Sequence, residues 1–269
     1  MLSIIFKMSR DYLIAVINDT IDACDDCFYT NEKNKGVEIK YEDMMFPVKN
    51  TIKISSLTVP KILLDKPCEI KIINDDSLNV GLLLKDEGFN PVVLNMASMI
   101  RPGGGYMTGA RAQEESLFRR TNLYKCLNDN LYPINIGQAL YTPNAIVIKD
   151  SKHKYYDEYK KMSFIACPAY RLKSTSDFDD FVKKTTANKI RLMLDIGLKY
   201  GHDSIVLGAF GCGAYHNPVI SIAELFKKII YEEKYNYCYK KIVFAIIDDG
   251  NAKSNNSEGN FSPFSKVFD

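Results

Sequence analysis

A short apolar strand runs into three consecutive glycines near the middle of this chain. Residues 91–96 read PVVLNM, which predicts a buried strand, and glycines stand at positions 103–105. Gln-Glu-Glu follows at 113–115, after a spacer of seven residues, on the first turns of a helix predicted over 110–127. A strand, a glycine loop and a helix in this order are typical of open α/β sheets, in which ligands bind beyond the strand ends.

The same alternation continues along the chain from residue 69 onward. Apolar runs predict strands at 69–73, 91–96, 145–149, 163–167, 204–207 and 241–247. Amphipathic spacing predicts helices over 76–85, 110–127, 185–200 and 219–231. Strands that alternate with helices indicate an α/β fold with helices on both faces of one sheet.

The first 68 residues have a different character. Helical spacing covers residues 8–29, a polar loop is predicted over 30–40, and residues 51–59 alternate like a strand. We therefore predict an N-terminal accessory segment over 1–68, packed on a core domain over 69–269. Near the other end, residues 251–260 are a mildly polar stretch without a predicted element.

The composition favours a soluble intracellular protein, cytoplasmic or nuclear. Residues 1–19 lack a continuous apolar stretch and a cleavage site, which argues against a signal peptide, and nothing reaches the ~18 apolar residues of a spanning helix. Seven cysteines, an odd number, suit a reducing compartment better than a disulfide framework. A net charge of +2 does not favour direct DNA binding. Clustered lysines such as Lys160 and Lys161 are expected on solvated faces, with a basic surface for a polyanion as the alternative.

Two strand-to-helix junctions are rich in glycine, residues 102–109 and 208–218. Glycine lets the backbone approach a ligand without a Cβ atom in the way, and helix N-termini attract phosphate. One such junction is weak evidence for a ligand. Two of them in one chain predict a diphosphate that is held from both sides.

Glu114 and Glu115 have two interpretations. Neighbouring glutamates are common on solvated helices, where they point about 100° apart around the helix axis. A general acid that works near neutral pH needs a raised pKa, from burial or from a like charge beside it. The residues by themselves leave both interpretations open.

The sequence around these glutamates resembles a known family. Residues 95–124, NMASMIRPGGGYMTGARAQEESLFRRTNLY, are similar to the bacterial-type poly(ADP-ribose) glycohydrolases, whose signature is Gly-Gly-Gly, a short spacer and Gln-Glu-Glu. A second similar stretch, residues 190–218, ends in GAFGCGAYHNP, where the family has its second ligand loop. The resemblance spans about residues 69–250. It implies a macrodomain-like fold with three α/β/α layers around a mixed, mostly parallel sheet.

The resemblance implies hydrolysis of the ribose–ribose O-glycosidic bond in poly(ADP-ribose), with ADP-ribose as the product. Among the catalytic residues, Glu115 would be the acid, while Glu114, together with Gln113, would position the site and the adjoining ribose. The substrate would be poly(ADP-ribose) or an ADP-ribosylated protein. This scheme requires no cofactor and no metal.

The resemblance also implies which residues bind the substrate. Gly103, Gly104 and Gly105 would lie against the diphosphate and the distal ribose, and Tyr215 would offer an aromatic face to the nucleotide. The second phosphate loop would consist of Gly211, Cys212, Gly213 and Ala214.

Two positions depart from the family pattern. Macrodomains commonly have Asn-Ala-Ala-Asn at the strand end, with the last asparagine on the ribose; residues 95–98 end in Ser98, which can hydrogen-bond sugar with a shorter reach. His216 stands where the family usually has glycine. Neither change removes Glu115. Elsewhere, the spacing of Cys24 and Cys27 fits two cysteines on a helix better than a metal site, because no second ligand pair accompanies it.

Three functions are compatible with these residues. A hydrolase of poly(ADP-ribose) is favoured, because the Gln-Glu-Glu motif is complete and a catalyst needs it. A non-catalytic ADP-ribose reader would use the same pocket only for binding. A hydrolase of mono-ADP-ribose linked to protein is the third possibility.

Overall fold

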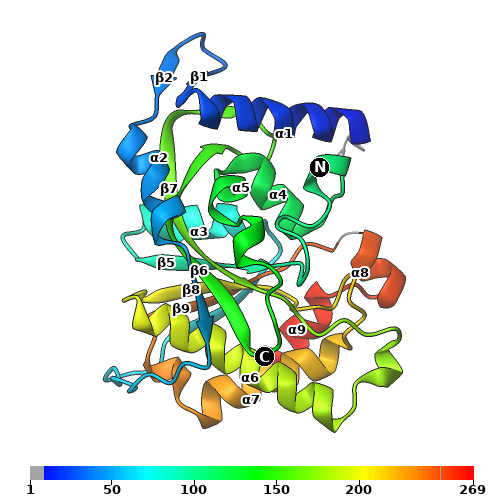
Figure 1. Cartoon of the computed structure of the whole chain (residues 1–269). Coiled ribbons are helices and arrows are strands. Elements are labelled where there is room, and N and C mark those ends of the chain that lie inside the picture. The colour runs from blue at the N-terminus through cyan, green and yellow to red at the C-terminus, as the bar shows by residue number, and fades with distance from the viewer. Residues whose placement is uncertain (1–8, 249) are drawn as a thin grey trace.

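A seven-stranded sheet lies between two layers of helices in the computed structural model of the chain (Figure 1). The structure describes residues 9–248 and 250–269. The prediction that residues 1–19 are not a signal peptide therefore falls partly on residues 1–8, which lie outside the described residues. The strands follow the order β3-β6-β7-β5-β8-β9-β4. Their bounds are β3 (Ile52–Ser55), β4 (Glu69–Ile73), β5 (Pro91–Met96), β6 (Gln138–Lys149), β7 (Tyr155–Cys167), β8 (Ser204–Leu207) and β9 (Lys241–Ala245).

The sheet is mixed and mostly parallel, as the resemblance implies. Strand β5 pairs in parallel with β7 and β8, and β9 pairs in parallel with β8 and β4. Only β3 with β6 and β6 with β7 pair antiparallel within this sheet. Because the five parallel strands point the same way, their carboxyl ends share one edge of the sheet, where a ligand site is expected.

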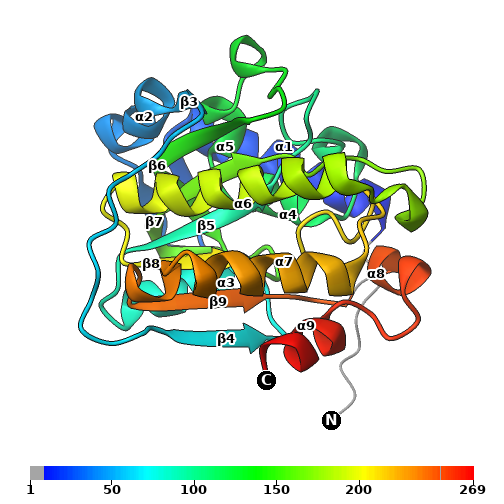
Figure 2. The ribbon, with the colours of Figure 1, turned by 90° about the horizontal axis from the view of Figure 1, so that it is seen from below.

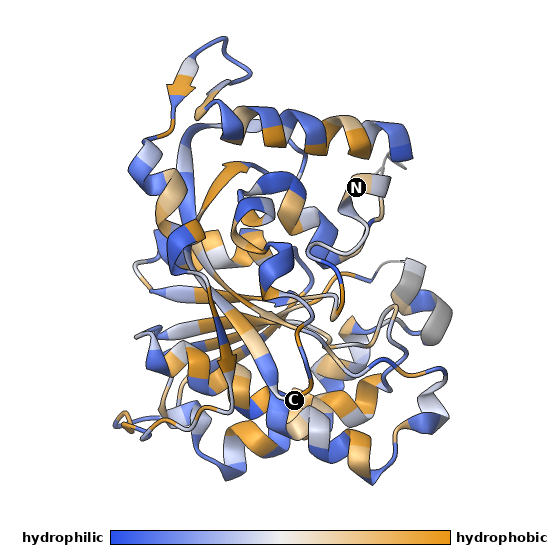
Figure 3. Ribbon diagram, in the orientation of Figure 1, coloured by the Kyte–Doolittle hydropathy of each residue, from blue (hydrophilic) through white to orange (hydrophobic). Residues whose placement is uncertain are grey.

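Helices cover both faces of the sheet, which confirms the predicted three-layer α/β/α class (Figure 2). On one face lie α6 (Asp180–Lys199) and α7 (Val219–Glu232), with α9 (Phe261–Phe268) against α7 and β4. On the other lie α3 (Ser77–Asp86), α4 (Gln113–Arg120) and α5 (Leu123–Cys126). Successive side chains of β5 point to opposite faces of the sheet. Val92 and Leu94 pack in the core on the α6 and α7 side, and Val93 packs in the core on the α3 and α4 side. Figure 3 shows apolar residues on the central strands and mixed polar and apolar residues along α6 and α7.

The N-terminal segment packs directly on these elements. Helix α1 (Arg10–Asp25) lies against α4, and α2 (Tyr41–Asn50) lies against β6. Strand β3 extends the sheet beyond β6, so the segment and the following residues share one sheet. The buried Nζ of Lys149 in β6 bonds Asp19 (2.6 Å) and Thr20 (2.7 Å) of α1. The domain boundary after residue 68 stays a prediction.

Two segments expected to lack regular structure contain short elements. The predicted loop at 30–40 contains part of a hairpin of β1 (Phe28–Thr30) and β2 (Gly36–Glu38), so the prediction was wrong at residues 30 and 36–38 and right for the turn at 31–35. The side chain of Asn31 builds the turn, because its Oδ1 accepts the N–H groups of Lys33 and Lys35 (3.0 Å each). Within the polar stretch near the C-terminus lies α8 (Gly250–Asn255). Strands of three residues are too short to produce a readable alternation.

The helix predicted over 110–127 is two helices in the structure. α4 ends at Arg120, and Thr121 adopts an extended conformation with φ −141°. Asn122 then exchanges hydrogen bonds with Ile146 of β6, through its N–H group (3.0 Å) and its Oδ1 atom (2.9 Å). These bonds to the sheet interrupt the helix before α5 begins. Strands β6 and β7 are also longer than the predicted runs at 145–149 and 163–167, and the missed part of β6 includes the buried residues Ala139, Leu140 and Tyr141.

Among the described residues, no helix has both the length and the apolar character needed to cross a membrane.

Candidate active site

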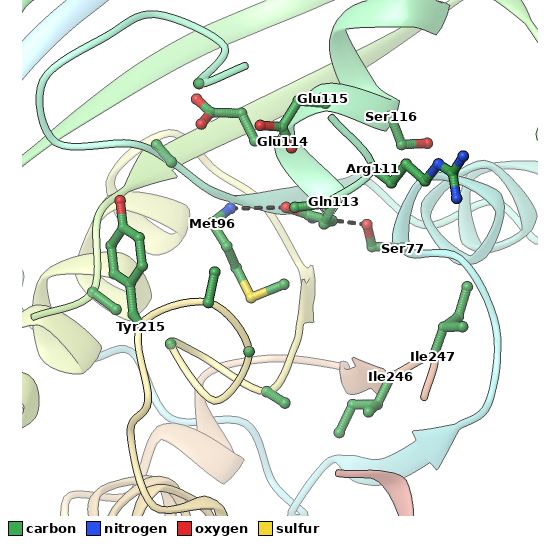
Figure 4. Close-up of a pocket in the computed structure, with 18 of the residues that line it drawn as sticks. Ser77, Met96, Arg111, Gln113, Glu114, Glu115, Ser116, Tyr215, Ile246 and Ile247 are labelled. Atoms are coloured by element: carbon green, nitrogen blue, oxygen red, sulfur yellow. Dashed lines mark hydrogen bonds between the residues drawn. The ribbon is translucent and has the colours of Figure 1, made fainter. Parts of the chain in front are cut away.

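A pocket of about 440 Å³ opens at the carboxyl ends of the parallel strands (Figure 4). Met96 of β5 and Ala245 of β9 line it, as do Ala169 after β7, Ala209 after β8 and Asp75 after β4. Both glycine-rich junctions therefore contribute to one pocket, which is where the sequence placed a diphosphate. In Figure 4, Tyr215 of the second junction lies across the pocket from Arg111, which follows the first junction.

Gln113 fastens the beginning of α4 to the end of β5. Its Oε1 accepts the N–H of Met96 (2.9 Å), and its Nε2 donates to the carbonyl of Leu94 (2.6 Å) and to Oγ of Ser77 (2.9 Å) (Figure 4). One side chain thus joins α4, β5 and α3. These three hydrogen bonds fix the start of α4, so that Glu114 and Glu115 line the pocket.

Glu114 is buried, with 4% of its surface exposed, and both of its carboxylate oxygens accept backbone N–H groups. Oε2 accepts from Ser98 (2.7 Å) and Oε1 from Gly103 (3.2 Å). Burial raises the pKa of Glu114 to about 8, and the nearby Glu115 acts in the same direction, against the two hydrogen bonds that lower it. Glu114 therefore holds the strand end and the glycine loop together.

Glu115 is also buried, with 7% exposed, but only one of its oxygens is occupied. Oε1 accepts the N–H of Gly105 (2.9 Å), whereas Oε2 has no hydrogen-bond partner among the described residues. Gly104 lies beside this carboxylate with φ +57°, and a Cβ atom there would come within 2.6 Å of Glu115 Oε1. A carboxylate with one fixed oxygen and one unpaired oxygen at a pocket wall can exchange a proton with a ligand.

The second junction lines the opposite wall with backbone and one aromatic ring. Asn217 holds it, because its Nδ2 donates to the carbonyls of Tyr170 (2.8 Å), Gly211 (3.2 Å) and Tyr215 (3.2 Å). The side chain of Cys212 points into the core, and burial raises the pKa of its thiol. A thiolate nucleophile at Cys212 is therefore disfavoured.

Most of the site residues predicted from the sequence line this one pocket. These are Ser98, Gly104, Gln113, Glu114, Glu115, Gly211, Gly213, Ala214 and Tyr215. Three others do not line it. Gly103 packs against the ring of Phe118, Gly105 lies against Ala110, and Cys212 is in the core. Ser98 lines the pocket while its Oγ accepts the N–H groups of Ile100 (3.3 Å) and Arg101 (3.2 Å), so this hydroxyl also caps a turn.

Several lining residues were not predicted. Most of them end or closely follow a strand of the parallel sheet or begin the next helix: Asp75, Asp76, Ser77, Ala169, Ala209, Ala245, Ile246 and Ile247. The rule that ligands bind beyond strand ends could have found these. Asn260 gave no such signal, because it comes from the polar stretch before α9 and reaches the pocket only through tertiary packing. Within the described part of the chain, no group of three or more His, Cys, Asp or Glu side chains could hold a metal ion.

The fold is shared with solved structures of one kind of enzyme. Poly(ADP-ribose) glycohydrolase from Thermomonospora curvata superimposes with a TM-score of 0.84 at 22% identity, over 96% of this chain and 100% of that one. The same enzyme bound to the inhibitor ADP-HPD gives a TM-score of 0.79 at 21% identity, over 96% and 99%. The enzyme from Deinococcus radiodurans in complex with ADP-ribose gives 0.71 at 19% identity, over 83% and 95%. At these identities the likeness concerns the fold. A search among curated proteins finds no match.

Fold and pocket together define a macrodomain-like glycoside hydrolase domain. The family model for the microbial-type PARG (poly(ADP-ribose) glycohydrolase) catalytic domain matches residues 17–160, more than half of the 269 residues. The chain belongs to this family. The matched range contains the glycine loop, Gln113, Glu114 and Glu115, and it begins within α1. The second junction, at 208–218, lies beyond it.

Proposed function

We propose that this chain hydrolyses the ribose–ribose O-glycosidic bond of poly(ADP-ribose), with Glu115 as its general acid and base and ADP-ribose as its product. The observation that carries the proposal is the carboxylate of Glu115. Its Oε1 is fixed by the N–H of Gly105, and its buried Oε2, in the wall of the pocket, has no partner within the described part of the chain. Family membership supports the same reaction.

In this mechanism, protonated Glu115 gives its proton to the leaving ribose oxygen as the glycosidic C–O bond breaks. Positive charge develops on the anomeric carbon, as in other glycoside hydrolases. Water then forms the new C–O bond and returns a proton to the Glu115 carboxylate, so the residue ends in its starting state. Glu114 would not take this role, because both of its oxygens are bonded to backbone N–H groups.

Substrate binding would use the two junctions from opposite sides. The backbone of Gly211, Gly213 and Ala214 would face the diphosphate, and Tyr215 would pack against the nucleotide. Gly104 would lie near the ribose beside Glu115. Planar groups stack well on tyrosine rings, and close backbone approach suits phosphate. The substrate would be the free polymer or an ADP-ribosylated protein.

We further propose that the enzyme works inside the cell. None of the seven cysteines, all of them among residues 9–248, forms a disulfide. Free thiols persist in a reducing compartment, whereas secreted proteins usually carry disulfides. The modified protein or polymer on which it acts would therefore be cytoplasmic or nuclear.

The deciding experiment compares wild type with Glu115→Gln on labelled poly(ADP-ribose). Glu224→Gln, an exposed glutamate on α7, is the matched control. We expect release of ADP-ribose from wild type and the control, and a loss of about 10²–10⁴-fold in Glu115→Gln, the usual contribution of a general acid. ADP-ribose binding should persist in the variant.

Other outcomes would favour other functions. Binding of ADP-ribose without turnover by wild type would indicate the non-catalytic reader. Release from singly modified protein, with no cleavage of the polymer, would indicate the hydrolase of protein-linked mono-ADP-ribose. Equal turnover in wild type and Glu115→Gln would remove Glu115 from the mechanism.

A further inference from the structure

Arg119 is a buried cation on the same helix as Glu115, one turn further along. Its side chain is 2% exposed, although charged side chains are rarely buried without a specific partner. Nη1 donates to the carbonyl of Ala110 (2.8 Å), while Nε has no hydrogen-bond partner among the described residues. Arg119 is absent from the pocket lining, so it does not reach a ligand directly.

The carbonyl of Ala110 belongs to a ring of hydrogen bonds that returns to Glu115. Arg119 Nη1 donates to Ala110 O (2.8 Å), and Ala110 N–H donates to Gly105 O (3.3 Å). Gly105 N–H then donates to Glu115 Oε1 (2.9 Å). The ring closes through α4, on which residues four apart lie on the same face. Arg119 thus anchors the loop segment that presents Gly105 to the acid.

Charge couples the two side chains as well. Burial lowers the pKa of Arg119 to about 10, and the charge of Glu115 opposes that shift, so the guanidinium stays positive at neutral pH. Both side chains also have a buried polar atom that no described group satisfies, Oε2 in Glu115 and Nε in Arg119. A cation beside the acid stabilises the carboxylate that remains after proton donation.

The N-terminal helix supports this arrangement from behind. Oγ1 of Thr20 donates to the backbone carbonyl of Arg119 (2.7 Å). Gly109 lies against the backbone of Arg10, where an added Cβ atom would come within 2.8 Å of its carbonyl oxygen. The backbone of Arg119 and the chain next to Ala110 therefore both contact α1.

We propose that Arg119 is a positioning residue for Glu115: it holds the N–H of Gly105 in place through Ala110 and sets a fixed positive charge beside the acid. The inference rests on the proposed function. It predicts that removal of the guanidinium slows the chemical step and leaves substrate binding nearly intact, because the second junction and Gln113 are not part of the ring.

The test measures kcat, KM and ADP-ribose affinity for Arg119→Ala and Arg119→Lys. The matched control is Arg191→Ala on α6, whose partly exposed guanidinium pairs with Glu233 (2.7 Å) away from the pocket. We expect kcat of Arg119→Ala to fall about 10²-fold, the usual consequence of a misplaced catalytic group. KM and the affinity for ADP-ribose should change less than roughly threefold, because binding contacts remain.

Rescue by free guanidinium separates positioning from general damage. Low concentrations of guanidinium chloride should raise kcat of Arg119→Ala and leave that of Glu115→Gln unchanged. Arg119→Lys keeps a cation without the planar fork, so its kcat should lie between those of wild type and Arg119→Ala. If Arg119→Ala does not fold, the kcat and KM of Arg119→Lys test whether Arg119 positions Glu115.

Two results would overturn the proposal. One is a kcat of Arg119→Ala, or of Arg119→Lys if the alanine variant does not fold, within threefold of wild type. The other is a parallel loss of kcat and ADP-ribose affinity without rescue, which indicates a structural role alone. Both are distinct from failure of the proposed function, in which wild type itself does not turn over the polymer or Glu115→Gln is as active as wild type.

Discussion

The two glycine-rich junctions have the same order of strand, loop and helix, yet they use their backbone differently. In the first, the N–H groups of Ser98, Gly103 and Gly105 are bonded to the carboxylates of Glu114 and Glu115. In the second, Asn217 ties carbonyl groups together, and the wall it supports has no acidic side chain. The first junction therefore holds two carboxylates, whereas the second presents backbone and an aromatic ring to the pocket.

Their glycines are needed for different reasons. At Gly104, an added Cβ atom would meet the carboxylate of Glu115. At Gly211, which has φ +76°, it would come within 2.5 Å of Asn217 Nδ2 and 2.6 Å of the Ala169 side chain, both parts of the scaffold. Glycines in a sequence thus indicate that other atoms approach the backbone closely. They do not indicate whether those atoms belong to a ligand or to the protein. The comparison between the junctions can be tested with substitutions on each side.

Among substitutions within the two junctions, the largest effect is expected for Gly104→Ala. The new Cβ atom would lie 2.6 Å from Glu115 Oε1 and would be strained at φ +57°, so the acid must move. We expect kcat to fall about 10²-fold or more, since small displacements of catalytic groups have effects of this size. Steady-state kinetics on poly(ADP-ribose) provide the measurement.

Gly88→Ala is the matched control for that substitution. Gly88 also has a positive φ, +88°, but an added Cβ atom would meet nothing within 4 Å. It should lose about 1 kcal/mol of stability from backbone strain and keep its turnover. If both variants kept full activity, the contact between Gly104 and Glu115 would not matter for catalysis.

A smaller effect is expected for Tyr215→Ala in the second junction. Loss of the aromatic face should raise KM about tenfold, since stacking contacts contribute roughly 1 kcal/mol or more. kcat should change little, because Tyr215 is not bonded to either glutamate. Tyr231→Ala, an exposed tyrosine on α7, is the control and should behave as wild type. A fall in kcat with unchanged KM would contradict the division of work between the junctions.

The parts of the fold that could be predicted are those set by local pattern. Strands β4, β5 and β8 have the predicted bounds. For β5 and β8, buried on both faces, the signal is a continuous apolar run between turn residues. The hairpin at Phe28–Glu38 was missed because its strands are three residues long and its turn depends on the side chain of Asn31. Local pattern does not report such contacts.

The same distinction applies to the site. Gln113, Glu114 and Glu115 were found because polar groups cluster after a glycine loop at a helix start. The different roles of the two glutamates come from tertiary contacts, since Ser98 and Gly103 occupy both oxygens of one of them. Arg119 gave no signal in the sequence, because a cation on a helix is usually solvated and its burial depends on tertiary packing.

The last prediction concerns stability, and it tests whether burial of the Glu114 carboxylate in the first junction destabilises the fold. Burial raises the pKa of Glu114 from an ordinary 4.5 to about 8. Between these values Glu114 binds a proton in the folded chain that it does not bind in the unfolded chain, so its own contribution to the free energy of unfolding falls as pH rises from 4.5 to 8. The slope reaches at most about 1.4 kcal/mol per pH unit. Glu114→Gln cannot titrate and should flatten this slope, whereas Glu224→Gln should retain it. Urea unfolding at several pH values measures both, and a slope that survives in Glu114→Gln would mean that another group produces it.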